Sequence, residues 1–345
     1  MNTAVLPTHT PALFSNAVER AAALLRAGEL VALPTETVYG LAANAFNSEA
    51  VARIYEVKGR PVRNPIIVHV AGLELARECV ADWPPLAAKL SRAFWPGPLT
   101  LVLPRSPRIP DVVTAGGPTV GVRWPSHPFM QAVIRACGFP LAAPSANPAN
   151  QLSPTNAEHV HKAFDGKIPL IVDGGQSQVG LESTVLDITG ASPRLLRPGM
   201  VQIESLLAAI GEAGLRLTAP DWSGGTETPL RSPGMLPKHY SPKAKLIIRS
   251  WESEADLEGQ MNLLTFRREK TCVIAHSRIP LAGRFGRVAV LPHDAEAYAR
   301  ALYAELHQCD EAGADLIIVE APPPDDAWRA ISDRLVRATG SPPDP

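Results

Sequence analysis

Three cations, Lys58, Arg60 and Arg63, stand within six residues and are followed directly by Asn64. Ammonium and guanidinium groups held this close together suit a polyanion such as a nucleoside triphosphate. The same turn has a second interpretation, because a lysine at the end of a helix also complements the negative end of the helix dipole. Spacing alone leaves both interpretations open, so the surrounding elements must decide between them.

Other polar side chains stand where short apolar runs end. Thr35 and Thr37 follow one such run, and Arg123 ends another. An arginine in that place needs a partner for its charge, which is solvent, an internal carboxylate or a ligand. His69 alternates with apolar neighbours, a spacing more typical of a core histidine than of a ligand contact.

A short polar segment, Ser145 to Asn147, lies between Pro144 and Pro148 at the end of a further apolar run. Flanking prolines hold such a segment in place, so that its hydroxyl and amide groups can be presented at low entropic cost. By itself, the segment is more typical of a Ser or Asx turn.

The residues around these side chains predict a strand, a hydroxyl-rich turn, a helix, a cationic turn and a second strand. Short Val, Ile and Leu runs bounded by proline predict strands over Leu30–Leu33 and Ile66–Val70. Between them, apolar residues at helical spacing predict a helix capped by Ser48. The candidate side chains then lie on loops of a rigid scaffold, where functional groups commonly occur.

The rest of the first 212 residues continues the α/β pattern. We expect a loose arm over Met1–Leu13 and then a helix opened by a capping box from Asn16 to Glu19. Further strands are predicted over Thr100–Leu103, Thr119–Arg123, Pro140–Ala143, Ile168–Val172 and Glu182–Asp187, and one more begins at Arg194. Further helices are predicted over Leu73–Cys79, Leu86–Phe94, Pro128–Ala136, Thr155–Phe164 and Ile203–Ile210.

A change in composition divides the chain into a domain over 1–212, an interdomain segment over 213–245 and a domain over 246–345. The segment is rich in Gly, Pro, Ser and Thr but also carries Met, Leu, His and Tyr, so we expect it to pack across the first domain as a lid. Beyond it, strands alternate with helices, which predicts a small open α/β domain of the Rossmann type. That domain has no G-x-G-x-x-G after its first strand, so nothing marks it as a cofactor binder.

Composition indicates an ordinary globular chain. Hydrophobic residues make up 46% and charged residues 19% of 345 residues, which excludes a disordered chain. The net charge of -1 argues against a surface that coats nucleic acid. Four dispersed cysteines predict reduced, mostly buried thiols, and the chain shows no secretion or membrane signal, so we expect a cytoplasmic protein without a membrane association.

Several familiar catalytic motifs are missing from the sequence. It has no G-x-x-x-x-G-K-[ST], no G-x-S-x-G and no H-E-x-x-H. His159 and His161 stand two apart in a predicted helix and point to different faces, so we expect no metal site there.

An ordered set of motifs nevertheless resembles one known family. The set comprises LPTETVYGLAANA, KGRPVRNPIIVHV, TVGVRWPSHP, APSANPANQLSPT, ESTVLDI and LLRPG. Over Ala17 to Ile210 the chain resembles the YrdC-like domain of threonylcarbamoyl-AMP synthases, and SPGMLPKHYSP with the following α/β region is similar to the two-domain branch of that family. The resemblance implies an α/β fold with a YrdC-like twisted mixed sheet and flanking helices, a linker and a Rossmann-like domain.

The resemblance also implies which residues act. In the family's K-x-R and S-x-N pairs, Lys58, Arg60, Ser145 and Asn147 match the catalytic residues around the nucleotide. The resemblance therefore replaces the core interpretation of His69 and the turn interpretation of Ser145 by a role in the site. Residues that match further ATP contacts are Asn64, Thr119, Ser153, Arg197 and Tyr240. Residues that match the threonine pocket are Thr35, His69, Arg123, Ala143 and Ser183.

The implied reaction forms threonylcarbamoyl-AMP and pyrophosphate from L-threonine, bicarbonate or CO2, and ATP, with Mg2+ accompanying ATP. Downstream proteins would transfer the product to transfer RNA, and direct tRNA binding by this chain is left open. The alternatives are a double-stranded RNA-binding module without catalysis, a carbamoyl-transfer domain of a larger maturation enzyme, and a purely structural α/β protein. Near-zero net charge argues against the first, missing zinc-finger cysteines against the second, and the motif set against the third.

Overall fold

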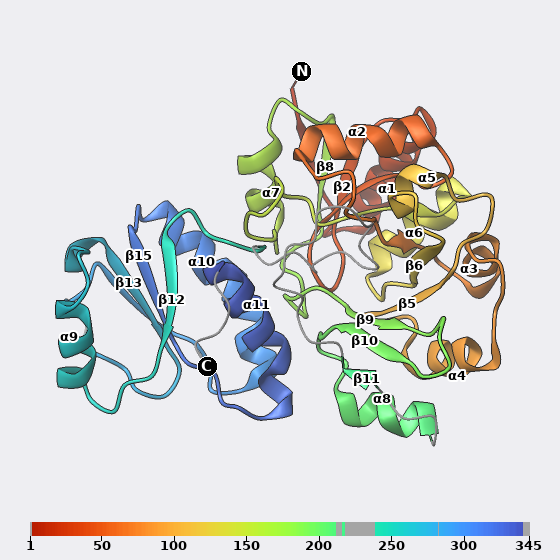
Figure 1. Ribbon diagram of the computed structural model, residues 1–345. Helices are drawn as coiled ribbons and strands as arrows, with labels where there is room; N and C mark the ends of the chain where they lie inside the picture. Colours follow the sequence, from red (N-terminus) through yellow and green to blue (C-terminus); the bar gives the residue numbers. More distant parts are fainter. Residues whose placement is uncertain (1, 212–215, 218–238, 282, 341–345) are drawn as a thin grey trace. The chain divides into compact units, whose positions relative to one another are not determined.

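The computed structural model of the chain describes residues 2–211, 216–217, 239–281 and 283–340 (Figure 1). These residues form two compact units. The first contains 2–149, 153–211 and 216–217, and the second contains 150–152, 239–281 and 283–340. The predicted domain border at residue 212, and the part of the predicted lid over 218–238, lie outside the described residues.

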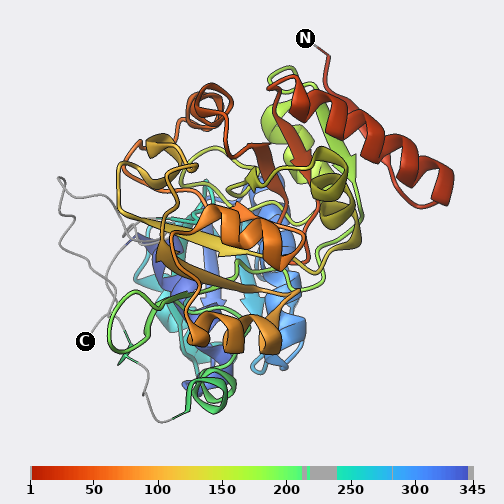
Figure 2. The ribbon, with the colours of Figure 1, turned by 90° about the vertical axis from the view of Figure 1, so that its right-hand side faces the viewer.

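A mixed sheet forms the centre of the first unit and is drawn in Figures 1 and 2. In the described part of the chain it has 11 strands in the order β1-β8-β2-β3-β7-β4-β6-β5-β9-β10-β11, with parallel and antiparallel neighbours, which confirms the predicted mixed sheet. The strands are β1 (Ala4–Pro7), β2 (Val31–Leu33), β3 (Gly40–Asn44), β4 (Val68–His69), β5 (Leu99–Pro104), β6 (Thr119–Arg123), β7 (Leu141–Ala142), β8 (Leu170–Asp173), β9 (Thr184–Asp187), β10 (Arg194–Arg197) and β11 (Arg216–Leu217).

Helices cover both faces of this sheet. They are α1 (Pro11–Arg26), α2 (Ser48–Lys58), α3 (Leu73–Cys79), α4 (Pro85–Phe94), α5 (Asp111–Thr114), α6 (Pro128–Cys137), α7 (Ala157–Phe164) and α8 (Ile203–Ile210). Helices α1 and α6 pack together on one face, where the rings of Phe14 and Phe129 lie 5.1 Å apart. Figure 2 shows α1, in red, as a long helix on the outside of the unit.

The side chains of β2 alternate between two hydrophobic clusters, one on each face of the sheet. Val31 and Leu33 pack into the cluster formed with α1 and α6, whereas Ala32 packs into the larger cluster that includes α2, α4 and α7. Successive strand side chains point to opposite faces of a sheet, so a short strand can be buried on both faces only if it is apolar throughout. The strand ends are then the positions where polar side chains can stand.

The second unit has a parallel four-stranded sheet in the order β12-β15-β13-β14, and the predicted Rossmann-like architecture is confirmed. Its strands are β12 (Lys245–Arg249), β13 (Thr271–Ala275), β14 (Arg287–Val290) and β15 (Leu316–Glu320), and its helices are α9 (Glu254–Asn262), α10 (Ala295–Glu311) and α11 (Arg329–Thr339). The tripeptide 150–152 joins this unit, because Ser241 N–H donates to the Asn150 carbonyl at 2.9 Å.

Several predictions about element starts are wrong. The helix expected from Thr155 begins at Ala157 instead, with Asn156 as its N-cap. The predicted loose arm contains β1, which pairs with β8. Helix α1 begins at Pro11 with Thr10 as its N-cap, so Asn16 and Glu19 do not form a capping box. Asn47, not Ser48, caps α2, because its side chain accepts the N–H groups of residues 49 and 50 at 3.0 and 3.1 Å.

Candidate active site

Lys58 is the last residue of α2, and it lies almost completely buried with 3% of its surface exposed. Gly59 ends the helix in the left-handed region, at φ 59°, which turns the chain toward Arg60. The Lys58 ammonium donates to the carbonyl oxygens of Ser145, at 2.5 Å, and of Asn147. These contacts bring the two halves of the predicted catalytic set, the K-x-R and S-x-N pairs, together.

Burial and the neighbouring Arg60 charge lower the pKa of the Lys58 amine well below its usual range. A negatively charged ligand beside Lys58 would act in the opposite direction, because it would favour the ammonium form. Burial at Lys58 therefore disfavours the charged form that an anionic ligand would favour.

Arg60 organises the turn that follows. Its Nε donates to the Asn64 carbonyl at 3.0 Å, and its Nη2 donates to the Pro65 carbonyl at 2.7 Å. The Asn64 side chain is buried, and neither its Nδ2 nor its Oδ1 has a hydrogen-bond partner among the described residues. A buried amide without partners is costly, so it indicates a place for a polar ligand.

The third cation of the turn takes a different place. Arg63 is half-buried and, with Glu56 and Asp111, lines a cavity of about 580 Å³ between α2 and α5. Of the other two cations, Lys58 contacts the S-x-N segment, and Arg60 holds the turn at Asn64 and Pro65. The cationic turn thus supplies two residues to the catalytic set and one residue to another surface.

Arg123 ends β6, and its charge is met by an internal carboxylate. Its Nη2 lies 2.7 Å from Glu36 Oε1, its Nη1 donates to Thr37 Oγ1 at 2.9 Å, and its Nε donates to the Gly97 carbonyl at 3.3 Å. The contact with Glu36 is an ion pair without hydrogen-bond alignment, so Nη2 has no aligned acceptor among the described residues. Of the three partners considered from the sequence, the internal carboxylate is the one present.

The other predicted threonine-pocket residues surround Arg123. His69 is its direct partner in the pairing of β4 with β6, and Ala143 N–H donates to the Ile67 carbonyl at 3.1 Å. Thr35 forms a turn after β2, in which its hydroxyl donates to the Val38 carbonyl at 2.6 Å. Burial, together with the Arg123 charge, lowers the pKa of His69 to about 3, so the ring is neutral at physiological pH.

Ser183 connects to the same region through β5. Its hydroxyl lies 2.8 Å from Thr100 Oγ1, and Arg197 donates to it at 3.1 Å and to its carbonyl at 3.0 Å. Thr184 N–H donates to the Pro98 carbonyl, next to the Gly97 carbonyl that Arg123 contacts. Arg197 and Ser183 thus contact each other directly, and the Gly97–Pro98 backbone connects them to Arg123; we call these three residues the polar layer.

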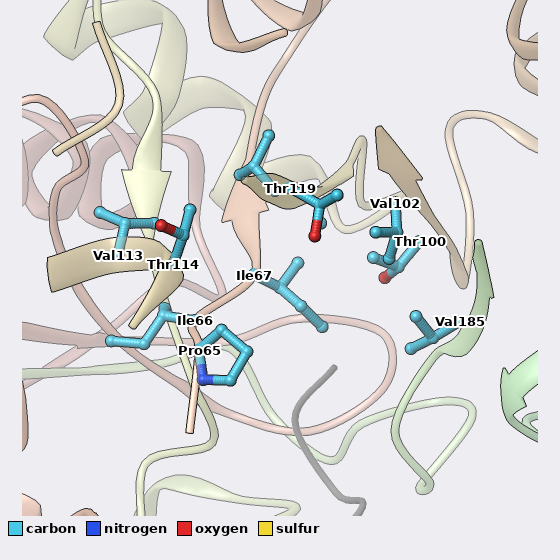
Figure 3. A pocket seen from close by; sticks show the side chains of 11 residues that line it. Pro65, Ile66, Ile67, Thr100, Val102, Val113, Thr114, Thr119 and Val185 are labelled. Atoms are coloured by element: carbon cyan, nitrogen blue, oxygen red, sulfur yellow. The ribbon is translucent and has the colours of Figure 1, made fainter. Parts of the chain in front are cut away.

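Figure 3 shows a narrow slot beside this layer. Ile67 lies in its middle, with Thr119 above it and Val102 and Val185 across from it. The slot encloses about 10 Å³, which is room for one water and too small for a purine ring. Thr119, a predicted ATP contact, is half-buried at the slot, so a base beside it would lie at the mouth.

Two predicted ATP contacts are placed differently from the rest. Ser153 is buried, and its hydroxyl donates to Glu182 Oε1 at 2.5 Å. Tyr240 belongs to the second unit, where its ring lies 5.2 Å from the Arg334 guanidinium and 6.1 Å from the Tyr303 ring. Its predicted reach over the nucleotide stays a prediction.

Sequence reasoning named Thr37 among the candidate side chains but missed Glu36 and Glu182 as members of the network. Glu36 is buried at 5% exposure between two threonines, and Glu182 is buried directly before Ser183. A glutamate in the short turn just beyond a buried apolar strand is a signal that could have identified Glu36, because carboxylates are rarely buried unless paired.

The histidine pair of α7 and the helices are the features relevant to metal binding and to membrane spans. Among the described residues, no group of three or more His, Cys, Asp or Glu side chains is arranged to hold a metal ion. His159 is buried, whereas the half-exposed His161 pairs with Asp165 at 3.6 Å. None of the helices in the described ranges is long and apolar enough to cross a bilayer.

Comparisons with known proteins cover nearly the whole chain. A family model described as "Telomere recombination" matches residues 23–199, and one described as "Threonylcarbamoyl-AMP synthase, C-terminal domain" matches residues 200–340. The chain is 39% identical to a threonylcarbamoyl-AMP synthase of Pyrococcus abyssi over 93% of each chain, and 42% identical to one of Bacillus subtilis over 94% of this chain and 93% of the relative. A crystal structure of P. abyssi Sua5 complexed with L-threonine matches with a TM-score of 0.89 and 38% identity over 98% of each chain.

Proposed function

Because this chain belongs to the threonylcarbamoyl-AMP synthase family, we propose that its first unit binds L-threonine and ATP side by side along the polar layer described above. The chain is an enzyme, an adenylyl-transferring synthase that forms threonylcarbamoyl-AMP and pyrophosphate for tRNA modification. The observation that carries the placement is the junction at Lys58, where the K-x-R and S-x-N pairs meet.

Threonine is assigned to the strand ends around Arg123. The guanidinium Nη2, which lacks an aligned acceptor among the described residues, would pair with the substrate carboxylate. The neutral His69 and the buried hydroxyls of Thr35 and Ser183 would line the rest of the pocket. A pocket built to hydrogen-bond a hydroxyl selects threonine over an apolar isostere, because the wrong ligand leaves buried polar groups unpaired. The P. abyssi relative in complex with L-threonine supports threonine as the substrate.

ATP is assigned to the cationic side of the same layer. Lys58 and Arg60 would offset charge on the phosphates, and the unpartnered amide of Asn64 would supply a further polar contact. The base would lie toward Thr119, at the mouth of the slot in Figure 3. In this assignment the triphosphate would favour the charged form of Lys58, which burial and Arg60 disfavour.

Mg2+ would enter with ATP. The described residues provide no cluster of metal-binding side chains, and triphosphate oxygens and water are ligands that Mg2+ prefers. The ion would neutralise charge on the phosphates during transfer.

The chemistry requires few special side chains. The threonine amine adds to CO2, and an oxygen of the resulting carbamate attacks the α-phosphorus of ATP, which releases pyrophosphate. Because the substrate supplies the nucleophile, the protein contributes proximity and charge neutralisation. The missing serine-elbow and cysteine motifs are therefore consistent with this reaction.

A release assay tests the proposal. Pyrophosphate should appear only when L-threonine, bicarbonate and ATP are all present, and RNA should not be required. Release without threonine, or no release with all three substrates, would contradict the assigned reaction.

The RNA-binding alternative is disfavoured by burial. Lys58, Arg60, Arg123 and Arg197 are each at most 8% exposed, whereas a duplex is bound through surface cations that reach its phosphates. We also propose that the product passes to separate tRNA threonylcarbamoyl-transfer proteins. We place the reaction in the cytoplasm, where its four buried free cysteines would stay reduced.

A further inference from the structure

Glu36 stands at the centre of the predicted threonine pocket without an assigned role. It lies three residues beyond the end of β2, between Thr35 and Thr37. Its Oε1 forms the ion pair with Arg123 and accepts the Ser126 N–H at 3.1 Å. Its Oε2 is buried as well, yet it has no hydrogen-bond partner among the described residues.

An unpaired carboxylate oxygen in this place is costly. Leaving a buried acceptor unsatisfied costs about 1–3 kcal/mol, and more for a charged group. Burial raises the pKa of Glu36, but the Arg123 charge and the hydrogen bonds outweigh it and hold the pKa below its usual value. Glu36 is therefore ionised at neutral pH, and Oε2 is a negative acceptor that lacks a donor.

The polarity of the pair matches a zwitterion. Arg123 and Glu36 present a positive and a negative group side by side, with their nearest atoms 2.7 Å apart. An amino acid carries its ammonium and its carboxylate on the same carbon, so it can set each group against the opposite charge of this pair. Both protein groups have one buried polar atom without an aligned partner in the described part of the chain, namely Glu36 Oε2 and Arg123 Nη2.

We propose that Glu36 recognises the amino group of the substrate threonine by accepting its N–H through Oε2. This inference rests on the proposed placement of threonine at Arg123. Glu36 thereby requires an α-amino acid, whereas the hydroxyl-lined part of the pocket reads the side chain.

The same contact persists after the amine adds to CO2. The bound ammonium first loses one proton, and the amine loses a second as its nitrogen bonds to CO2; both protons pass to water or bicarbonate. The carbamate nitrogen keeps one N–H, which can still donate to Oε2. The negative carboxylate of Glu36 repels the carbamate oxygens, so these oxygens turn away from Glu36 and are left available for the phosphate.

Calorimetric binding of two ligands tests the proposal. L-threonine is compared with 2,3-dihydroxybutanoate of matching configuration, which keeps the carboxylate and the side chain but replaces the amine by a hydroxyl. The wild-type protein should bind threonine about 10- to 100-fold more tightly, as expected for loss of a hydrogen bond to a charged group. Glu36→Gln should lose most of this preference, because its amide oxygen is retained by Ser126 N–H and its NH2 then faces the ammonium.

The outcomes separate the possibilities. Equal affinity of the wild-type protein for both ligands overturns the proposal. This comparison needs no variant, so the proposal can be tested even if Glu36→Gln folds poorly. Equal weakening of both ligands in Glu36→Gln would mean that Glu36 only holds Arg123, which also overturns it. Arg123→Gln should weaken both ligands; if it weakens neither, the threonine placement itself fails. Glu158→Gln, an exposed change on α7, should match the wild-type protein.

Discussion

The ammonium of Lys58 lies 2.5 Å from the carbonyl oxygen of Ser145, which stands 87 positions further along the chain. This contact ties the end of α2 to the segment that follows β7. Two loops that are distant in sequence therefore share one cation, and the nucleotide site depends on both of them.

Removal of that cation should nearly abolish the reaction. We expect Lys58→Ala to lower pyrophosphate release by about 100-fold or more, because it deletes a phosphate-neutralising charge and leaves two buried carbonyls unpaired. Arg60→Ala should have a similar effect, since Arg60 holds the Asn64 turn. Steady-state pyrophosphate assays measure both, and circular dichroism checks the fold. Lys162→Ala removes an exposed cation of α7 and should leave the rate unchanged; full activity in both site variants would show that the phosphates are misplaced.

The protonation of Lys58 should change when ATP binds. The free-state pKa of its amine is lowered by burial and by Arg60, and an incoming triphosphate raises it again. We therefore expect net proton uptake on ATP binding at alkaline pH, measured by calorimetry in buffers of different ionisation enthalpy. Lys58→Arg, which stays charged, should bind ATP with less uptake, whereas Lys162→Arg should keep the wild-type value. Identical uptake in Lys58→Arg would contradict this assignment.

His69 should make the first unit acid-sensitive. Its pKa is about 3 in the folded chain and about 6.5 in the unfolded chain, so the unfolded state binds more protons between these values. Stability is fully present above pH 6.5 and falls as the pH decreases, by about 1.4 kcal/mol per pH unit for this group. His69→Gln should flatten the decline measured by urea unfolding between pH 6.5 and 4.5. His161→Gln, which changes a half-exposed ring, should not; equal slopes in all three proteins would refute the burial argument.

Glu320 should stabilise the second unit. Its carboxylate, at the end of β15, accepts the N–H groups of His276, Ser277 and Arg278 and the Ser277 hydroxyl. Glu320→Gln removes the negative charge from these hydrogen bonds and replaces one acceptor oxygen by a donor. Either the Ser277 hydroxyl or the His276 and Ser277 N–H groups then lose their acceptor, at a cost of about 1–3 kcal/mol. Hydrogen exchange of the amides of residues 276–278 should become faster. Glu252→Gln alters an exposed glutamate and should leave these amides protected. Unchanged exchange in Glu320→Gln would argue against a stabilising role of the Glu320 hydrogen bonds.

Much of the fold could be predicted from local patterns. Strand β6 and helices α3 and α8 have the predicted bounds, because their apolar periodicity is strong and their ends carry turn residues. Caps were less predictable. Asn47 and Ser48 both suit an N-cap, and only the backbone geometry decides that Asn47 holds the first turn of α2. The pairing of β1 with β8 joins segments more than 160 residues apart, which no local pattern records.

The site was predictable as a set of residues but not as a network. The motifs indicated Lys58 and Arg123. Neither composition nor spacing, however, identifies Glu36 and Thr37 as the partners of Arg123, because both stand at least 86 positions earlier in the chain. Long-range partners of this kind depend on strand order, and the order of β2, β4 and β6 in the sheet is set by tertiary packing.

The backbone at Gly59 has a consequence for variation within the K-x-R pair. A side chain there would meet open space, so bulk is no obstacle, but the left-handed backbone excludes β-branched residues. Asparagine is the natural substitute, because it tolerates the left-handed conformation. Valine would force a different backbone conformation at position 59 and move Arg60 away from the Pro65 carbonyl. The left-handed backbone thus limits which residues can occupy position 59 of the K-x-R pair, just as the need for positive charge limits positions 58 and 60.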